Sequence, residues 1–286
     1  MHPGRCPQCE DIEVCPHCGS KIRNFRHVGV RSTGIAGSSI WHYSEPCGHR
    51  ISVESRPVAG TLGRALAVYN GGPLWNNGYG WFNIFWGKFW DGQPLVEQVN
   101  RVTADIEASV SYSGGLSQYN VGIGKFSGST VVTSSPSHKV SNIEIGTELA
   151  KWIRDGTIPN LGTRGAYNVF LPPGITALLG NDSSCAVFCD YHDTANGDNG
   201  PFFTCEPYPC NSGCNQCTSL SLDTLTQGLS EEMVELKTDM NPGTGWTIGT
   251  MELCDYCDQN FVCNRISTGE YVNAWYSNAT DSCWKP

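Results

Sequence analysis

Between residues 94 and 160 the apolar positions recur at helical spacing. A run that starts at Pro94 repeats apolar residues every three or four positions, which predicts a helix with one buried side. The residues of that side are Leu95, Val99, Val102 and Ile106. The next helix begins at the capping-box pattern Ser141-Asn142-Ile143-Glu144 and ends before Pro159. Its inward-facing residues are Ile145, Leu149, Trp152 and Ile153.

Two buried strands and a third helix complete this pattern. Residues 81–90 are rich in aromatic side chains and follow the Asn77-Gly78 turn, which predicts a strand packed on the first helix. Residues 167–171 predict a second strand, which Pro172 stops. The third helix has apolar residues spaced by 3, 4, 4 and 3 positions, namely Leu222, Leu225, Leu229, Met233 and Leu236. Together these elements predict a mixed α and β fold.

The third helix also carries three glutamates. Glu231 and Glu235 are four residues apart and therefore share one face, with Glu232 beside the first. This is the spacing of the H-E-x-x-H metallopeptidase helix, but Glu231 stands where the first histidine ligand would be. Ligands that are all oxygen favour calcium, magnesium or manganese over zinc. The alternative interpretation is that the three glutamates form a solvent-facing helix surface.

Composition and charge narrow the class of protein. The chain has 286 residues, 39% of them hydrophobic, which suffices for one large domain or two unequal ones, and its 33 glycines indicate a loop-rich surface. Residues 1–56 carry 7 Lys and Arg against 5 Asp and Glu, whereas residues 57–286 carry 11 against 22, a net charge of −11. Nucleic-acid binding is therefore not expected. The sequence also predicts no membrane span and shows no secretory signal.

Five cysteines near the N-terminus predict a structural zinc site. Cys6-Pro-Gln-Cys9 and Cys15-Pro-His-Cys18 are C-x-x-C turns of the kind that hold zinc, and Cys47 follows later. The favoured ligands are Cys15, Cys18, Cys47 and either His49 or His42, while Cys6 and Cys9 complete that site instead or share a second one. Two disulfides with an odd thiol are the alternative. Residues 1–56 are thus interpreted as a zinc-ribbon-like module, separate from a domain at 57–286.

The other ten cysteines all lie after residue 184. Their even number permits five disulfides, which are typical of proteins in an oxidising environment. Cys210, Cys214 and Cys217 offer a metal-binding alternative to disulfides. The disulfide candidates are Cys185, Cys189, Cys205, Cys210, Cys214, Cys217, Cys254, Cys257, Cys263 and Cys283.

Short motifs between residues 68 and 284 follow one another in a characteristic order. They are Gly71-Gly72-Pro73-Leu74, Ile84-Phe85-Trp86-Gly87, Val169-Phe170-Leu171-Pro172-Pro173-Gly174, Ser184-Cys185, Phe188-Cys189-Asp190-Tyr191-His192, residues 230–239, Gly245-Trp246 and Glu252-Leu253-Cys254-Asp255-Tyr256-Cys257. In this order the motifs resemble those of the exordium-like (phosphate-induced protein) family and its microbial relatives. The resemblance leaves the N-terminal cysteines outside.

The resemblance implies an α+β, zincin-like mixed α/β domain that is loop-rich and contains disulfides. By position it makes Glu235 a metal ligand, Glu232 the general base, and Glu252 or Asp255 a later acidic ligand. Because Glu231 replaces the family's histidine, the resemblance implies a degenerate metal site. His192 is either a partner of that site or a hydrogen-bonded structural residue.

Two functions follow as expectations. The first is a catalytically degenerate zincin-like protein that acts as a structural or binding component of a virion, appendage or surface assembly. It would be exposed outside the cell or on a particle, and its partners would be other proteins of the assembly or further copies of itself. The second is a metal-dependent, peptidase-like hydrolase with a carboxylate-rich site. The expected cofactors are zinc in the N-terminal module and calcium or another divalent ion at the carboxylates.

Overall fold

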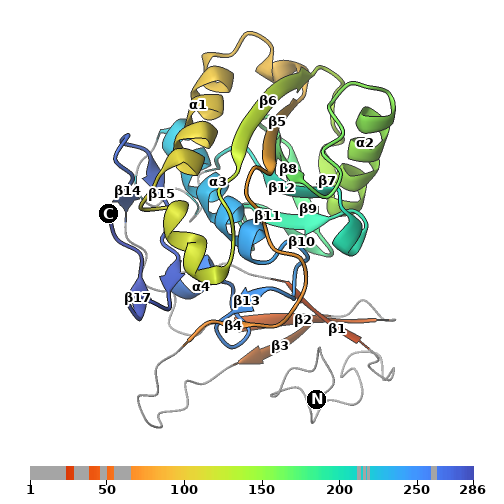
Figure 1. The fold of residues 1–286 in the computed structure, drawn as a ribbon. Helices are drawn as coiled ribbons and strands as arrows, with labels where there is room; N and C mark the ends of the chain where they lie inside the picture. Colours follow the sequence, from red (N-terminus) through yellow and green to blue (C-terminus); the bar gives the residue numbers. More distant parts are fainter. Residues whose placement is uncertain are drawn as a thin grey trace.

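The computed structural model describes residues 24–28, 39–45, 50–54, 66–210, 214, 217, 220–258 and 263–286. At its centre is a five-stranded sheet with the order β11-β12-β8-β5-β6 (Figure 1). Neighbouring strands are parallel except for β11, which lies at one edge and runs antiparallel to β12. The strands are β5 (Gly80–Trp86), β6 (Lys125–Val132), β8 (Gly165–Phe170), β11 (Tyr191–Thr194) and β12 (Phe202–Glu206).

Three long helices cover the two faces of this sheet. Helices α1 (Pro94–Ala108) and α3 (Ser221–Thr238) pack against each other on one face, and α2 (Asn142–Arg154) covers the other (Figure 1). The three helices predicted from apolar spacing are thereby confirmed. The predicted cap of α2 also forms, because the Ser141 hydroxyl accepts a hydrogen bond from the backbone N–H of Glu144 at 3.1 Å.

The predicted strands are present but shorter or shifted. All seven residues of β5 are buried, but the strand stops at Trp86 rather than Trp90. Gly87 has a φ of 117°, which turns the chain into a short 3-10 helix at Lys88–Trp90. Strand β8 is also fully buried and begins two residues earlier than predicted. Aromatic content predicted the buried strand, but only the glycine conformation marks its end.

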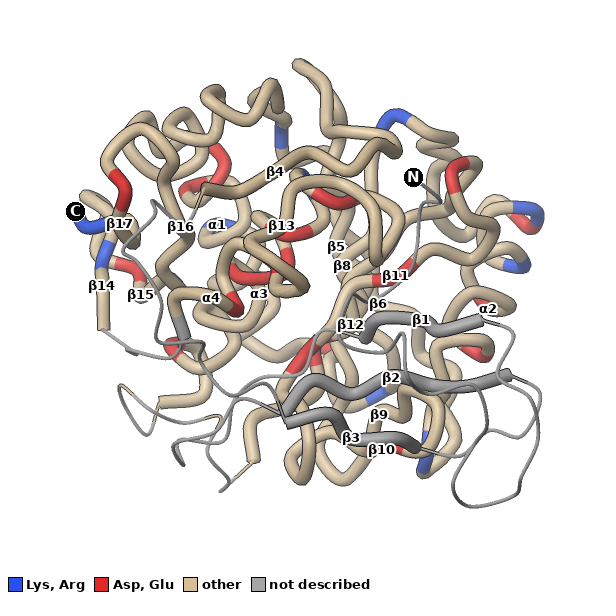
Figure 2. Tube along the Cα trace, turned by 90° about the horizontal axis from the view of Figure 1, so that it is seen from below, with Lys and Arg blue, Asp and Glu red and all other residues tan. Residues whose placement is uncertain are grey.

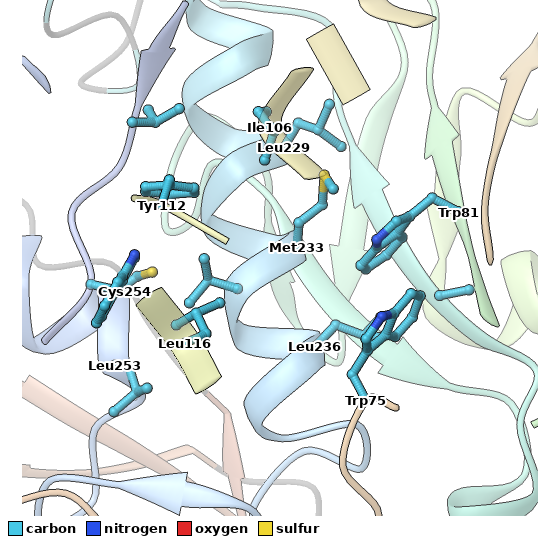
Figure 3. Packing of buried hydrophobic residues seen from close by; sticks show 14 of the residues in the cluster. Trp75, Trp81, Ile106, Tyr112, Leu116, Leu229, Met233, Leu236, Leu253 and Cys254 are labelled. Carbon is cyan, nitrogen blue, oxygen red and sulfur yellow. The ribbon is translucent and has the colours of Figure 1, made fainter. Parts of the chain in front are cut away.

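The larger hydrophobic core lies between the sheet, α1 and α3. Leu229, Met233 and Leu236 project from α3 into it, and Trp75 stacks on Trp81 with ring centroids 4.2 Å apart (Figure 3). The smaller core lies on the opposite face of the sheet, where α2 contributes Ile145, Leu149 and Trp152. Because α3 is buried on several sides, its apolar stripe fixes its rotation and so decides where its glutamates point.

A row of polar side chains crosses the central sheet from one edge strand to the other. The register aligns Ser129, Asn83, Asn168, Thr204 and His192 on five successive strands. The Asn168 amide donates to Asn83 Oδ1 at 2.8 Å, and the Thr204 hydroxyl donates to Asn168 Oδ1 at 3.2 Å. Buried amides paired in this way hold neighbouring strands in one register. The row ends at His192 on the edge strand.

Short elements surround this core. Strand β7 pairs with β9 and β9 with β10, β4 pairs with β13, β14 with β15, and β16 with β17. Helix α4 (Leu253–Asp258) packs against α3. The strands are β4 (Val68–Tyr69), β7 (Lys139–Ser141), β9 (Thr176–Leu179), β10 (Asp182–Ser183), β13 (Trp246–Thr247), β14 (Asn264–Arg265), β15 (Tyr271–Val272), β16 (Tyr276–Ser277) and β17 (Ser282–Cys283). None of the described helices has both the length and the apolar character needed to cross a membrane.

Four disulfides bind the second half of the chain together: Cys185–Cys210, Cys189–Cys214, Cys217–Cys263 and Cys257–Cys283. The metal-binding alternative for Cys210, Cys214 and Cys217 is therefore wrong. Four of the five disulfides that the even number permits are formed, because the candidates Cys205 and Cys254 are thiols buried in different hydrophobic cores. Four disulfides are typical of a protein that folds in an oxidising, extracellular environment.

Part of the N-terminal region forms a small antiparallel sheet. Strands β1 (Asn24–Val28), β2 (Ser39–Glu45) and β3 (Arg50–Glu54) pair in sequence order. His42 lies on β2. The other predicted zinc ligands, Cys6, Cys9, Cys15, Cys18, Cys47 and His49, lie outside the described residues. The zinc-ribbon-like module at 1–56 therefore stays a prediction.

Candidate metal centre

Three segments bring acidic side chains and one histidine to a common cavity. Helix α3 supplies Glu231, Glu232 and Glu235, since its apolar residues face the larger core and leave these positions on another side. Edge strand β11 supplies His192, and the start of α4 with the residue before it supplies Asp255 and Glu252. The cavity has a volume of about 390 Å³.

His192 is oriented by a backbone carbonyl. Its Nε2 lies 3.0 Å from the carbonyl oxygen of Asp239, which can only accept a hydrogen bond. Burial lowers the pKa of His192 to about 4, and the hydrogen bond to Asp239 acts in the opposite direction. The ring is therefore neutral near pH 7, with its proton on Nε2. This leaves the Nδ1 lone pair available, which is the arrangement of a histidine ligand held by a second hydrogen bond.

The lone pair of His192 faces a carboxyl group. Its Nδ1 lies 3.1 Å from Oε2 of Glu232, and both side chains are buried. Two atoms that both accept hydrogen bonds need a proton or a cation between them. Burial and the charges of Glu235 and Asp190 raise the pKa of Glu232, so its carboxyl group supplies that proton when no cation is bound.

Donor atoms converge in two sets that share Glu235. One set is His192, Glu232 and Glu235, and the other is Glu231, Glu235 and Asp255; within each set the donor atoms lie within 4.8 Å of one another. Oε1 of Glu235 also accepts a hydrogen bond from the backbone N–H of Asp255 at 3.1 Å, which ties α3 to α4. This donor chemistry fits a divalent cation, since carboxylates suit hard ions and the imidazole extends the range to first-row transition metals.

Asp239 and Glu252 close one end of the cluster. The Asp239 carboxylate accepts hydrogen bonds from Gly243 and Thr244 and so holds the loop after α3. Burial raises the pKa of Asp239 to about 6, and the hydrogen bonds from Thr244 and Gly243 act in the opposite direction. Oε1 of Glu252 lies 3.5 Å from His192 Nε2, and burial together with the charges of Asp239 and Asp255 raises the pKa of Glu252.

Among the described residues that line the cavity there is no lysine or arginine. Among the residues coloured in Figure 2, the acidic ones gather on α3, α4 and β11, whereas most lysines and arginines lie away from them. Burial raises the pKa of Glu235 as well, and the charges of Glu252, Asp255 and Glu231 add to this. Carboxyl groups buried together without an opposite charge either keep their protons or bind a cation.

The structure brings together all six residues predicted for this site: Glu231, Glu232, Glu235, Glu252, Asp255 and His192. The solvent-facing alternative for the glutamates is wrong, because the three on α3 are only 3–4% exposed. Sequence analysis missed Asp190 and Asp239. The sequence spacing could have indicated both. Asp190 precedes His192 by two residues, and Asp239 follows Glu235 by four, so each lies on the same side of its segment as a predicted site residue.

Comparison with known proteins gives little similarity. No family model matches the chain, and no curated protein matches it in sequence. Among solved structures, metalloproteinase-II from Bacteroides fragilis is similar with 9% identity and a TM-score of 0.32, over 64% of this chain and 53% of that one. The chain thus spans about half the length of that protein. The resemblance to the exordium-like family finds no support in a family model and stays a prediction.

Proposed function

We propose that this protein is a metal-dependent hydrolase with a zincin-like active site. The observation that carries the proposal is the convergence of His192 and the five predicted carboxyl groups on one cavity, whose described lining residues include no lysine or arginine. A purely structural cluster would gain nothing from burying these groups together, since each loses its hydration.

The chain's residues divide between holding a cation and moving a proton. Glu231, Glu235 and Asp255 would hold the ion, which supplies a Lewis acid that polarises a carbonyl group and makes water more acidic. Glu232 would take a proton from the attacking water and pass it to the leaving group. His192 fixes the position of Glu232 from 3.1 Å, and the Asp239 carbonyl fixes His192.

A peptide is the substrate class that the surroundings favour. The cavity is lined along the whole of β11, from Tyr191 to Thr194, and among the described strands β11 pairs only with β12. A strand with one open edge offers backbone donors and acceptors to an extended chain. Such a chain would pass over the carboxyl cluster.

The test compares turnover and cation content in matched variants of the full chain. Glu232→Gln is expected to abolish hydrolysis of quenched peptide substrates while keeping the cation, because the amide cannot carry the proton. Glu231→Gln with Glu235→Gln is expected to lose both. Glu148→Gln, on the outer side of α2, serves as the control. Turnover that persists in Glu232→Gln would rule out the proposed mechanism.

A non-catalytic binding component of a virion, appendage or surface assembly is the second candidate function. The observation that favours it is Glu231, which occupies the position of a histidine ligand in the H-E-x-x-H helix. This function predicts that the wild-type protein binds a cation without hydrolysing any peptide. In that case Glu231→His should raise the affinity for zinc, since the rest of the cavity is already in place.

A further inference from the structure

Two sets of donor atoms share the cavity of the candidate metal centre. The imidazole set is His192, Glu232 and Glu235, and the carboxylate set is Glu231, Glu235 and Asp255. Only Glu235 belongs to both sets. A carboxylate has two oxygens with about four lone-pair sites, so it can contact two ions at once. The two sets can therefore be filled at the same time, with Glu235 as the bridge.

The spacing inside the imidazole set fits one ion. Nδ1 of His192 lies 3.1 Å from Oε2 of Glu232, and the two side chains are 3% and 5% exposed. Two ligand atoms that each lie about 2.0–2.1 Å from a zinc ion are roughly 2.8–3.4 Å apart when the angle between them is about 90–110°. The observed separation falls within this range. The two side chains thus already lie where neighbouring ligands of one ion would be.

His192 presents a lone pair, not a proton, to this position. Its Nε2 lies 3.0 Å from the carbonyl oxygen of Asp239, which fixes the proton on Nε2. Histidines that bind metals are commonly held by such a second hydrogen bond. This observation concerns the imidazole and does not depend on how many carboxyl groups surround it. It points independently to a cation between His192 and Glu232.

The cavity has room for two ions. Its volume of about 390 Å³ is many times the roughly 10–15 Å³ that one water-sized particle needs. In two-metal sites the ions lie about 3.5–4 Å apart, a separation that one bridging carboxylate can span. Carboxyl groups from α3 and from the start of α4 line the same cavity, and their charge reduces the repulsion between two divalent ions.

The two positions differ in the ions that they favour. The carboxylate set offers oxygen alone, which suits calcium, magnesium or manganese. The imidazole set adds the nitrogen of His192, and imidazole suits zinc and similar transition metals. A hard ion and a zinc ion can therefore occupy the centre together, each in the set that matches its chemistry.

We propose that a second ion, zinc or a similar transition metal, binds to His192, Glu232 and Glu235 beside the ion of the carboxylate set and inhibits hydrolysis. The inhibition rests on the proposed function, in which Glu232 takes a proton from the attacking water. An ion bound to Oε2 of Glu232 takes the place of that proton, so the carboxylate can no longer accept it. The centre is then active with one ion and inhibited with two.

The first test counts zinc ions in the full chain. Manganese-loaded protein is dialysed to equilibrium against a series of zinc concentrations, and elemental analysis gives the zinc bound per chain. His192→Ala and Glu232→Gln are each expected to hold one zinc ion fewer than wild type, and zinc bound elsewhere in the chain cancels in this difference. Glu232→Gln keeps the shape of the side chain, so its loss of zinc does not reflect unfolding. His138→Ala is the control, because His138 is exposed and does not line the cavity.

The second test measures peptide hydrolysis by the manganese-loaded wild type over the same zinc concentrations. Activity is expected to fall by about a hundredfold or more, since general-base catalysis contributes on that order. Equal zinc content in wild type and both variants would mean that a proton, not an ion, lies between His192 and Glu232, and the proposal is wrong. Hydrolysis that zinc leaves unchanged or raises would overturn the inhibition. Absence of hydrolysis with manganese, calcium or magnesium alone would contradict the proposed function and the inhibition with it, whereas the zinc contents would still decide whether the second ion binds.

Discussion

Helix α3 buries ionisable side chains on two sides, and their surroundings differ between the two. On the side of the larger core, Lys237 donates to Oε1 of Glu107 at 2.7 Å, with both side chains 2% exposed or less, and Trp81 donates to the other oxygen at 2.9 Å. On the cavity side, Glu231, Glu232 and Glu235 have neighbouring carboxyl groups and a neutral histidine, and none of the described residues that line the cavity is a lysine or an arginine. The buried ion pair serves the fold, whereas the cluster of carboxyl groups marks the candidate metal centre.

Breaking the buried ion pair between Lys237 and Glu107 should have the largest effect on stability. Lys237→Met leaves Glu107 buried without its cation, and the expected loss of unfolding free energy is about 3–5 kcal/mol. Guanidinium denaturation followed by tryptophan fluorescence measures it. The double variant Lys237→Met with Glu107→Gln should recover part of the loss, because the introduced amide is uncharged and its oxygen can still accept from Trp81, while its NH2 group loses the hydrogen bond that Glu107 accepts from the backbone N–H of Gly124. A single variant as stable as wild type would show that the pair is not needed for the fold.

The same kind of change on the other side of α3 should depend on added cation. Glu235→Gln is expected to leave the metal-free protein at least as stable as wild type, since it removes one of several repelling carboxyl groups. The free energy of unfolding of the wild type should rise by about 2.7 kcal/mol when a divalent cation is present at 100 times its dissociation constant. That of the variant should rise much less. Thermal melts with and without chelator measure both. An equal gain in wild type and variant would place the cation elsewhere.

A neutral polar interaction in the sheet should give an intermediate effect. The Asn83 side chain accepts a hydrogen bond from Asn168 and donates hydrogen bonds to Asn100 and Thr103. Asn83→Leu therefore leaves these three buried side chains without their hydrogen-bond partner. The expected cost is about 1–3 kcal/mol. Chemical denaturation measures it, and hydrogen exchange should show faster opening of β5 and β8. A cost near zero would mean that the polar row does not set the strand register.

An exposed pair should give the smallest effect. Lys151 contacts Glu148 at 2.9 Å one turn away on α2, but the lysine side chain is 49% exposed. Lys151→Ala is expected to cost less than about 0.5 kcal/mol, because water already screens this pair. The same denaturation assay applies. A loss close to that of Lys237→Met would show that burial does not decide the strength of ion pairs in this protein.

The sequence predicted the helices far better than the environment of their side chains. Apolar spacing located α1, α2 and α3, and the i, i+4 spacing placed Glu231 and Glu235 on one face. Whether that face meets solvent depends on segments far away in the chain, because His192 and Asp255 cover it from β11 and α4. Local patterns contain no information about such coverage, which is why a solvent-facing surface remained open as an alternative.

For a similar reason, the sequence did not predict which cysteines form disulfides. Spacing alone did not separate Cys205 and Cys254 from their neighbours, although one lies in β12 within the smaller core and the other in α4 within the larger core. Which sulfurs meet is decided by the folded arrangement of the chain. The local signals near Asp190 and Asp239 were usable, since both follow from strand and helix periodicity.

Two of the disulfides would keep strand β11, which carries His192, attached after proteolytic cleavage of the turn that follows it. Cys185–Cys210 and Cys189–Cys214 join the segment before β11 to the segment after β12, and the turn between these strands exposes Ala195, Asp198 and Asn199. An exposed turn is where proteases cut most readily. A single cut there would leave both pieces held by two covalent bonds, so a nicked molecule keeps its histidine in place until it is also reduced.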